Sequence, residues 1–279
     1  MNAQERKELQ IAAAKIRLGI IEGVFHAKSG HPGGSLSAAE LFAYLYGKEL
    51  NVDPKNPKDP DRDRFVLSKG HCAPGYYAAL ALKGFFPMEE LQSLRHIGAM
   101  LQGHPDMKHT PGVDMSSGSL GQGISAAVGM ALAGKMDRKS YRVYTLLGDG
   151  ECEEGQVWEA AMFAAHQKLG RLVAIIDNNE LQIDGCIHDV CDPGDLGEKF
   201  AAFGWDVQRV CGHDIPALIE LFGRIKAEAA DTARPVCVIA RTVKGKGVSF
   251  MENQAGWHGK APKPEELEKA LAELSADAE

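Results

Sequence analysis

Several features that would define other classes of protein are missing from this 279-residue sequence. It has no uninterrupted apolar stretch of the roughly 18 to 20 residues that a membrane-spanning helix needs, and its polar start, MNAQERKELQ, is unlike a secretory signal. Six cysteines lie scattered without CxxC or Cys/His spacing, which argues against disulfides and a structural zinc site. A net charge of −7 supplies no basic face for nucleic acid. We therefore expect a cytoplasmic protein with neither a membrane nor a nucleic acid as its partner.

What the sequence does contain indicates one large α/β domain. Its composition, 44% hydrophobic and 25% charged, is ordinary for a globular protein, and the chain is long enough to bury a sizeable core. Strand-like and helix-like segments alternate, which predicts a mostly parallel sheet with helices on both faces. We place this domain at residues 1–264 and a charged surface helix or tail at 265–279. Within the domain, a helix is expected to start at Ser37, capped by its hydroxyl while Glu40 reaches back.

Two turns in the middle of the chain carry the clearest chemical signal. An apolar strand-like run at 141–147 leads into Gly148-Asp149-Gly150, a helical pattern follows at 156–169, and a second strand-like run at 171–176 leads into Asp177-Asn178-Asn179. This spacing suits a strand–helix–strand unit, in which both strands end at the same edge of the sheet. Asp149 and the paired asparagines are therefore expected to lie close together.

Carboxylate and amide oxygens at such an edge suit a hard divalent cation. Mg²⁺ prefers oxygen ligands and is commonly held by one or two protein groups together with the oxygens of a bound phosphate. Since Asp149 and Asn179 supply so few ligands, the cation would need a diphosphate to complete its shell. The two turns therefore suggest a cofactor that is carried by its diphosphate.

A GDG turn followed by a paired asparagine resembles the thiamine diphosphate fingerprint, and the chain from about residue 11 to 264 resembles the amino-terminal domain of transketolases. GDG alone is a weak signal, because turns of glycine and aspartate are common. The ordered set of motifs is far more specific. It comprises SGHPGG (29–34), DRFVLSKGH (63–71), GHPD (103–106), GSLGQG (118–123), GDG (148–150), DNN (177–179) and KGKGVSFMENQAGWHG (244–259).

The resemblance implies a role for individual residues of these motifs. It implies thiamine diphosphate and Mg²⁺ as cofactors, with the metal held by Asp149, Asn179 and the backbone carbonyl of Leu181. The catalytic residues it implies are His31, His104 and His258, which would face the sugar substrates. The cofactor-binding residues it implies are His71, Gly118, Leu120, Gly150, Asn179 and His258. The remaining histidines receive no such role: His26, His96, His109, His166, His188 and His213.

Other polar residues in the motifs keep two interpretations. Gly118 and Leu120 flank Ser119, which either caps a helix or belongs to a loop beneath the cofactor's thiazolium ring; many full-length transketolases have proline there. Lys244 and Lys246 either bind a phosphate as point charges or lie in a solvated turn. We interpret Glu153 and Glu154 as structural residues that offset a helix dipole. A dinucleotide site is disfavoured, because the GDG turn lacks the third glycine of GxGxxG.

Half of a transketolase active site is missing from these motifs. The resemblance implies that the glutamate contacting the aminopyrimidine ring comes from a separate pyrimidine-binding domain, so we expect a carboxyl-terminal partner subunit and an α2β2 assembly. The expected reaction transfers a two-carbon ketol unit between sugar phosphates, such as from xylulose 5-phosphate to ribose 5-phosphate. The alternatives are a deoxyxylulose-phosphate synthase-like enzyme, a transketolase for an unusual sugar, and a non-catalytic scaffold subunit.

Overall fold

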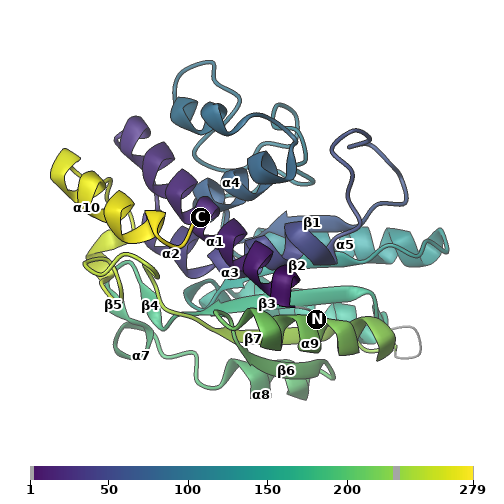
Figure 1. Cartoon of the computed structure of the whole chain (residues 1–279). Helices are drawn as coiled ribbons and strands as arrows, with labels where there is room; N and C mark the ends of the chain where they lie inside the picture. The colour runs from purple at the N-terminus through teal and green to yellow at the C-terminus, as the bar shows by residue number, and fades with distance from the viewer. Residues whose placement is uncertain (1–2, 229–232, 279) are drawn as a thin grey trace.

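A sheet of five parallel strands organises the chain (Figure 1). The computed structural model describes residues 3–228 and 233–278, and its strand order is β1-β2-β3-β7-β6. A separate two-stranded antiparallel hairpin, β4-β5, follows β3. The strands are β1 Arg64–Leu67, β2 Val143–Gly148, β3 Leu172–Asn178, β4 Leu181–Gln182, β5 Gly185–Cys186, β6 Asp206–Cys211 and β7 Val236–Arg241. The mostly parallel sheet predicted from the alternating pattern is confirmed.

Helices cover both faces of this sheet. They are α1 Ala3–Ala27, α2 Pro32–Ser37, α3 Ala39–Tyr44, α4 Ala73–Lys83, α5 Gln122–Met136, α6 Gly155–His166, α7 Ile187–Val190, α8 Leu196–Ala202, α9 Ile215–Glu228 and α10 Pro264–Ser275. Short turns of 3₁₀ helix lie at Gly70–Cys72, Met88–Ser93, Gly150–Glu153 and Ala255–Trp257, and a π-helical turn lies at Leu45–Glu49. None of the helices in the described ranges is long and apolar enough to cross a membrane.

Successive side chains of the central strands point into two different cores. In β2, Tyr144 and Leu146 pack into the larger core, which α1, α3, α4 and α9 cover. Val143 and Leu147 pack into the smaller core, which is covered by α5, α6 and α8. Because side chains alternate along a strand, a strand buried on both faces appears in the sequence as a continuous apolar run. This explains why the run at 141–147 is mostly apolar.

The carboxyl ends of the strands bring the sequence motifs together. β1 ends before Ser68, β2 before Asp149, β3 before Asn179 and β7 before Thr242. In an open parallel sheet, these ends form the edge at which ligands bind. The fold therefore gathers, at one edge, motifs that are far apart in the sequence.

The expected helix start at Ser37 is wrong. A helix already begins at Pro32, which suits a first helical turn, and Ser37 is its last residue. The Ser37 hydroxyl donates to the Gly34 carbonyl at 2.9 Å and to Asp177 Oδ2 at 2.5 Å instead of capping α3. Glu40 binds Arg17 and His213. Ser37 and Glu40 therefore bind residues far away in the sequence instead of forming a capping box. Local spacing cannot show such partners.

Candidate functional site

A cavity of about 250 Å³ lies at the carboxyl edge of the sheet. It contains every residue that the motifs predicted for the site except His104. Its lining consists of His31, Gly34, Lys69, His71, Gly118, Leu120, Gly148, Asp149, Gly150, Glu151, Asn179, Leu181, Gln182, Ile183, Lys244 and His258. The folded chain therefore builds one pocket from six of the seven motifs.

Three half-buried histidines form one wall of the pocket. The ring centroids of His31, His71 and His258 lie 5.1 to 5.3 Å apart in every pairing. Burial lowers the pKa of His31 to about 4 and that of His258 to about 3, and nearby cations add to both shifts. Burial likewise holds the pKa of His71 well below its ordinary value. At neutral pH the wall therefore offers uncharged imidazoles, each of which can donate one hydrogen bond and accept another.

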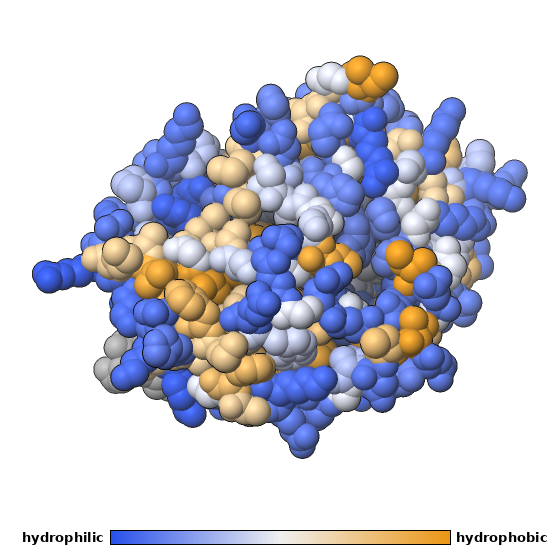
Figure 2. Space-filling model, turned by 180° about the vertical axis from the view of Figure 1, so that it is seen from behind, coloured by the Kyte–Doolittle hydropathy of each residue, from blue (hydrophilic) through white to orange (hydrophobic). Residues whose placement is uncertain are grey.

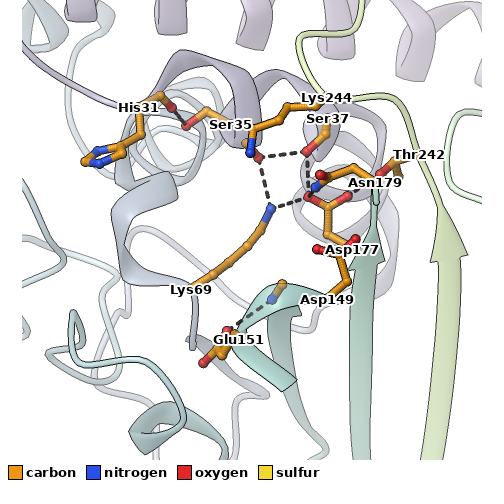
Figure 3. A network of polar contacts seen from close by, with 12 residues as sticks. His31, Ser35, Ser37, Lys69, Asp149, Glu151, Asp177, Asn179, Thr242 and Lys244 are labelled. Carbon is orange, nitrogen blue, oxygen red and sulfur yellow. Dashed lines mark hydrogen bonds and ion pairs between the residues drawn. The ribbon is translucent and has the colours of Figure 1, made fainter. Parts of the chain in front are cut away.

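His31 keeps an unused hydrogen-bonding group. It directly precedes α2, and its backbone carbonyl accepts a hydrogen bond from Ser35 Oγ at 2.8 Å. Its ring turns away from Ser35 (Figure 3). Within the described ranges, the buried Nδ1 atom of this ring has no hydrogen-bond partner. Because buried polar atoms are normally paired, this nitrogen is available to a ligand.

His104 lies beside the pocket rather than in its lining. It is exposed, and its ring packs near Gly118: a Cβ atom added to Gly118 would come within 3.1 Å of the imidazole. Gly118 has a φ of +153°, which favours glycine. Ser119 does not cap α5, whose first turn is preceded by Gly121. The loop therefore lines the pocket through Leu120 and through Gly118, where an added side chain would collide with His104.

Three oxygen donors meet where β2 and β3 end. Asp149 accepts the Gly150 amide at 2.9 Å through Oδ1 and the Glu180 amide at 2.5 Å through Oδ2. Asn179 Oδ1 accepts the Leu181 amide at 3.2 Å, and Leu181, whose carbonyl accepts Lys244 Nζ at 2.8 Å, lines the same pocket. Burial, reinforced by the charge of Asp177, raises the pKa of Asp149 to about 6.

These oxygen atoms suit a hard cation whose coordination shell is completed by a bound ligand. They comprise one carboxylate, one amide oxygen and one backbone carbonyl, the classes of ligand that Mg²⁺ prefers. A cation beside Asp149 would stabilise the carboxylate that burial disfavours. Nowhere in residues 3–228 and 233–278 do three or more His, Cys, Asp or Glu side chains gather to hold a metal ion.

Lys244 brings a buried positive charge to the pocket. It is 2% exposed, and its ammonium group lies 2.8 Å from the Leu181 carbonyl, to which it donates, and 2.9 Å from His258 Nδ1. Burial lowers its pKa to about 8. The solvated-turn interpretation is therefore wrong for Lys244. It suits Lys246, which is partly exposed and pairs with Glu252 at 3.1 Å.

A fully partnered network beneath the pocket could not be predicted from the sequence (Figure 3). Its centre is Asp177, which is completely buried and binds Lys69, Ser37, Thr242 and Asn179. Burial by itself would raise the pKa of Asp177, but the Lys69 ammonium and the hydrogen bonds hold it below its ordinary value. The DNN motif contains this aspartate, but the spacing of the motif could not show that Asp177 binds side chains from three other segments of the chain.

Glu151 was also missed, because it lies within the acidic run of the GDG turn. It is 3% exposed, and it accepts the Gly121 amide at 2.9 Å, the Gly148 amide at 3.0 Å and the Ser68 hydroxyl. Burial raises the pKa of this carboxyl group. Glu151 thereby ties β2 to the segments that follow β1 and precede α5. Its neighbour Glu153 accepts Gln182 Nε2 at 3.1 Å, so it supports the turn after β3.

Comparisons with known proteins point in the same direction as the pocket. Residues 8–279 match the family model of the transketolase thiamine diphosphate binding domain. The 6-deoxy-6-sulfo-D-fructose transketolase subunit of Clostridium sp. strain MSTE9 is 45% identical over 99% of this chain and 99% of its own length. An apulose-4-phosphate transketolase subunit of Phocaeicola vulgatus is 42% identical over 96% of this chain and 94% of its own length.

Longer relatives match through only part of their length. Human transketolase is 42% identical over 96% of this chain, which spans 42% of that protein. The solved transketolase of Leishmania mexicana has a TM-score of 0.89 at 30% identity; it covers 96% of this chain, which spans 41% of it. The chain thus corresponds to about two fifths of these proteins and to nearly the whole of the two subunits named above.

Proposed function

The chain belongs to the transketolase family, and from that premise we propose that it is the cofactor-binding subunit of a two-chain transketolase. It is a transferase domain that binds thiamine diphosphate. One observation supports the assignment as a cofactor-binding subunit. Residues from six separate motifs line one pocket, which contains both oxygen atoms that suit a metal ion and neutral histidines. When bound, thiamine diphosphate supplies the electron sink for ketol transfer.

The proposed metal and cofactor contacts are all made by residues that line the pocket. Asp149 and Asn179 hold Mg²⁺ through their side chains, and Leu181 holds it through its carbonyl. His71, Gly118, Leu120, Gly150, Asn179 and His258 contact the cofactor. Gly150 lines the pocket without a side chain, so a ligand can approach its backbone closely. The Lys244 ammonium adds a charge that favours the diphosphate.

The substrate contacts are assigned to the histidines. His31 and His258 can exchange protons with sugar hydroxyls, because both are neutral and His31 has a free buried nitrogen. His104 stands at the rim beside Gly118, where it can contact the donor sugar. These histidines orient the sugars and move protons, while the cofactor carries the carbon chemistry.

A second chain is expected to complete the site. The similar proteins of matching length are named as subunits, and single-chain transketolases are more than twice as long as this chain. Met162 and Phe163 of α6 are 56% and 44% exposed, and apolar groups interrupt the hydrophilic surface on the face seen in Figure 2. Exposed apolar surface of this kind favours protein contacts. We propose a carboxyl-terminal transketolase subunit with the pyrimidine-binding domain as partner, in an α2β2 assembly.

We propose two candidates for the sugar substrates of the reaction. The first is the transfer of a ketol unit from xylulose 5-phosphate to ribose 5-phosphate. The second is an unusual sugar, which is favoured by one specific observation: two similar subunits are named for 6-deoxy-6-sulfo-D-fructose and for apulose 4-phosphate. Both candidates require the same cofactor pocket, and they differ in the sugar that the partner and the rim must accept.

Reconstitution with a partner chain tests the proposal. The purified chain alone should show no ketol transfer, and adding a partner of roughly 300 residues should restore it with Mg²⁺ and thiamine diphosphate. A panel of xylulose 5-phosphate, 6-deoxy-6-sulfo-fructose and apulose 4-phosphate as donors separates the two substrate candidates. Activity of the isolated chain would contradict the two-chain arrangement. A stable complex that binds the cofactor but transfers from none of the donors would contradict the enzymatic role.

A further inference from the structure

The turn that carries Lys244 into the pocket is held at two points of its backbone. It follows β7, and the residues on either side of Lys244 are fixed by side chains from other elements. The Val243 amide donates to His213 Nε2 at 2.8 Å. The Lys246 carbonyl accepts Arg17 Nε at 2.9 Å. One residue before and two residues after Lys244, the turn is therefore anchored to groups that do not line the pocket.

Both anchoring side chains meet at one buried carboxylate. Arg17 Nη2 donates to both oxygens of Glu40 at 2.7 Å, and His213 Nδ1 lies 2.9 Å from Glu40 Oε2. Because His213 Nε2 accepts the Val243 amide, its proton lies on Nδ1 and is donated to Glu40. Arg17 and Glu40 are 7% and 8% exposed. The carboxylate thus fixes the direction of the guanidinium and the tautomer of the imidazole.

The backbone of the turn leaves little freedom between these anchors. The Gly245 amide donates to the Gly33 carbonyl at 2.9 Å, and the Lys244 carbonyl accepts the Asn253 amide at 2.9 Å. Gly247 has a φ of +92°, and a Cβ atom on it would lie 2.8 Å from Arg17 Cδ. The arginine therefore packs directly against the end of the turn, as well as binding it.

We propose that Arg17, Glu40 and His213 form a clamp that positions Lys244 for the diphosphate of the cofactor. The three are positioning residues, since they act through the turn and touch neither cofactor nor substrate. The inference rests on the proposed function, because it takes the diphosphate as the ligand of Lys244. A lysine has a long flexible side chain, so its charge is well placed only if its backbone is fixed. The clamp supplies that fixed point from outside the pocket.

A double-mutant cycle on thiamine diphosphate binding tests the clamp. The Kd is measured by calorimetry with saturating Mg²⁺ in the complex of this chain with its partner. Lys244→Ala should raise the Kd by roughly 10- to 100-fold, because it removes charged hydrogen bonds. His213→Ala should raise it by about tenfold, within the range of coupled neighbours. In the Lys244→Ala background, His213→Ala should change the Kd by less than about twofold.

Three further variants separate positioning from folding. His213→Gln keeps an acceptor for Val243 and a donor for Glu40, so it should recover most of the lost affinity. Arg17→Lys keeps the charge opposite Glu40 but loses the Nε donor, so it gives a milder test if His213→Ala unfolds. His166→Ala, an exposed histidine at the end of α6, should leave the Kd unchanged.

The outcomes distinguish the clamp from the proposed function. Failure of the wild-type complex to bind thiamine diphosphate would overturn the proposed function and the clamp together. Wild-type binding with an unchanged Kd in both His213→Ala and Arg17→Lys would overturn the clamp alone. Fully additive effects of His213→Ala and Lys244→Ala would also overturn it, since a clamp that acts through Lys244 cannot matter after the lysine side chain is removed.

Discussion

Asp149 and Asp177 occupy similar positions at the ends of neighbouring strands, but their surroundings differ. Asp177 pairs in register with Gly148, the residue before Asp149. Asp177 has an ammonium, two hydroxyls and an amide as partners, and its pKa is lowered despite complete burial. Asp149 accepts backbone amides at the pocket, and its pKa is raised to about 6.

The difference separates a structural carboxylate from one that is ready for a ligand. A buried charge whose partners are all within the chain needs nothing further, and removing one partner leaves the other uncompensated. A buried carboxylate with a raised pKa lacks compensating positive charge, which a bound cation would supply. The same distinction separates the Asp177 network from the histidine wall, where the His31 Nδ1 atom is buried and unpaired.

The largest expected effect concerns the groups that face the pocket. His31→Ala and His258→Ala should each lower turnover of the reconstituted enzyme by roughly 10²- to 10⁴-fold, the range for a positioned acid–base group. Thiamine diphosphate binding should change little in His31→Ala and more in His258→Ala, which is also assigned to the cofactor. Steady-state kinetics and calorimetry on the same preparations check this. Near-normal turnover in both variants would make these histidines structural.

Next in size is the stability of the network beneath the pocket. Asp177→Ala should lower the free energy of unfolding by about 3–5 kcal/mol, because it leaves the buried Lys69 ammonium uncompensated. Urea unfolding of the isolated chain measures this. Asp149→Ala is the matched control, and its loss should stay below about 1 kcal/mol, because its buried carboxylate is already disfavoured. Equal losses in the two variants would remove the distinction between the two aspartates.

Most of the fold and much of the site could be predicted from the sequence, because the signals are local. The apolar runs that form β2 and β3, and the helix between them, are each visible within about 15 residues of sequence. The glycine turns mark where strands end, and parallel strands bring such turns to one edge. Asp149 and Asn179 therefore lie in one pocket as expected, and Leu181, which only the family resemblance implied, lines it too; their role toward a metal stays a prediction.

Residues defined by distant contacts could not be predicted. Local spacing favours Ser37 as a helix cap, but its actual partner Asp177 lies 140 positions away. Lys69 could not be recognised within its motif, because its partner Asp177 is 108 positions away. His213 resembles an ordinary histidine in the sequence, since Glu40 and Val243, which it contacts, are 173 and 30 positions away. The hairpin β4-β5 could not be predicted either, because strands of two residues carry no periodic pattern.

A smaller effect is expected on cofactor affinity when Asp149, the carboxylate at the pocket, is removed. Asp149→Ala should weaken thiamine diphosphate binding by about 2–4 kcal/mol, roughly 30- to 1000-fold, since it removes the one charged ligand proposed for Mg²⁺. Calorimetry in the assembled complex, with Mg²⁺ titrated, measures this. Excess Mg²⁺ should recover part of the affinity. Wild-type affinity in this variant would exclude Asp149 as a metal ligand.

The smallest expected effect is the pH dependence of the free chain, which tests whether the histidine wall is truly uncharged. Burial lowers the pKa of His31 to about 4 and that of His258 to about 3, below the value near 6.5 expected in the unfolded chain. As pH falls through this window, the unfolded chain binds more protons than the folded chain, so stability must decrease. The stability that the neutral His31 and His258 contribute is fully present above pH 6.5 and is lost progressively toward pH 4. NMR of the histidine ring protons should show His31 and His258 unchanged between pH 5 and 8, whereas the exposed His188, whose pKa is raised by its hydrogen bond to Asp192, should titrate at a higher pH than either of them. If His31 and His258 titrated together with His188, the pocket would be more hydrated than its geometry indicates, and the proposed neutral donors and acceptors would be charged at neutral pH.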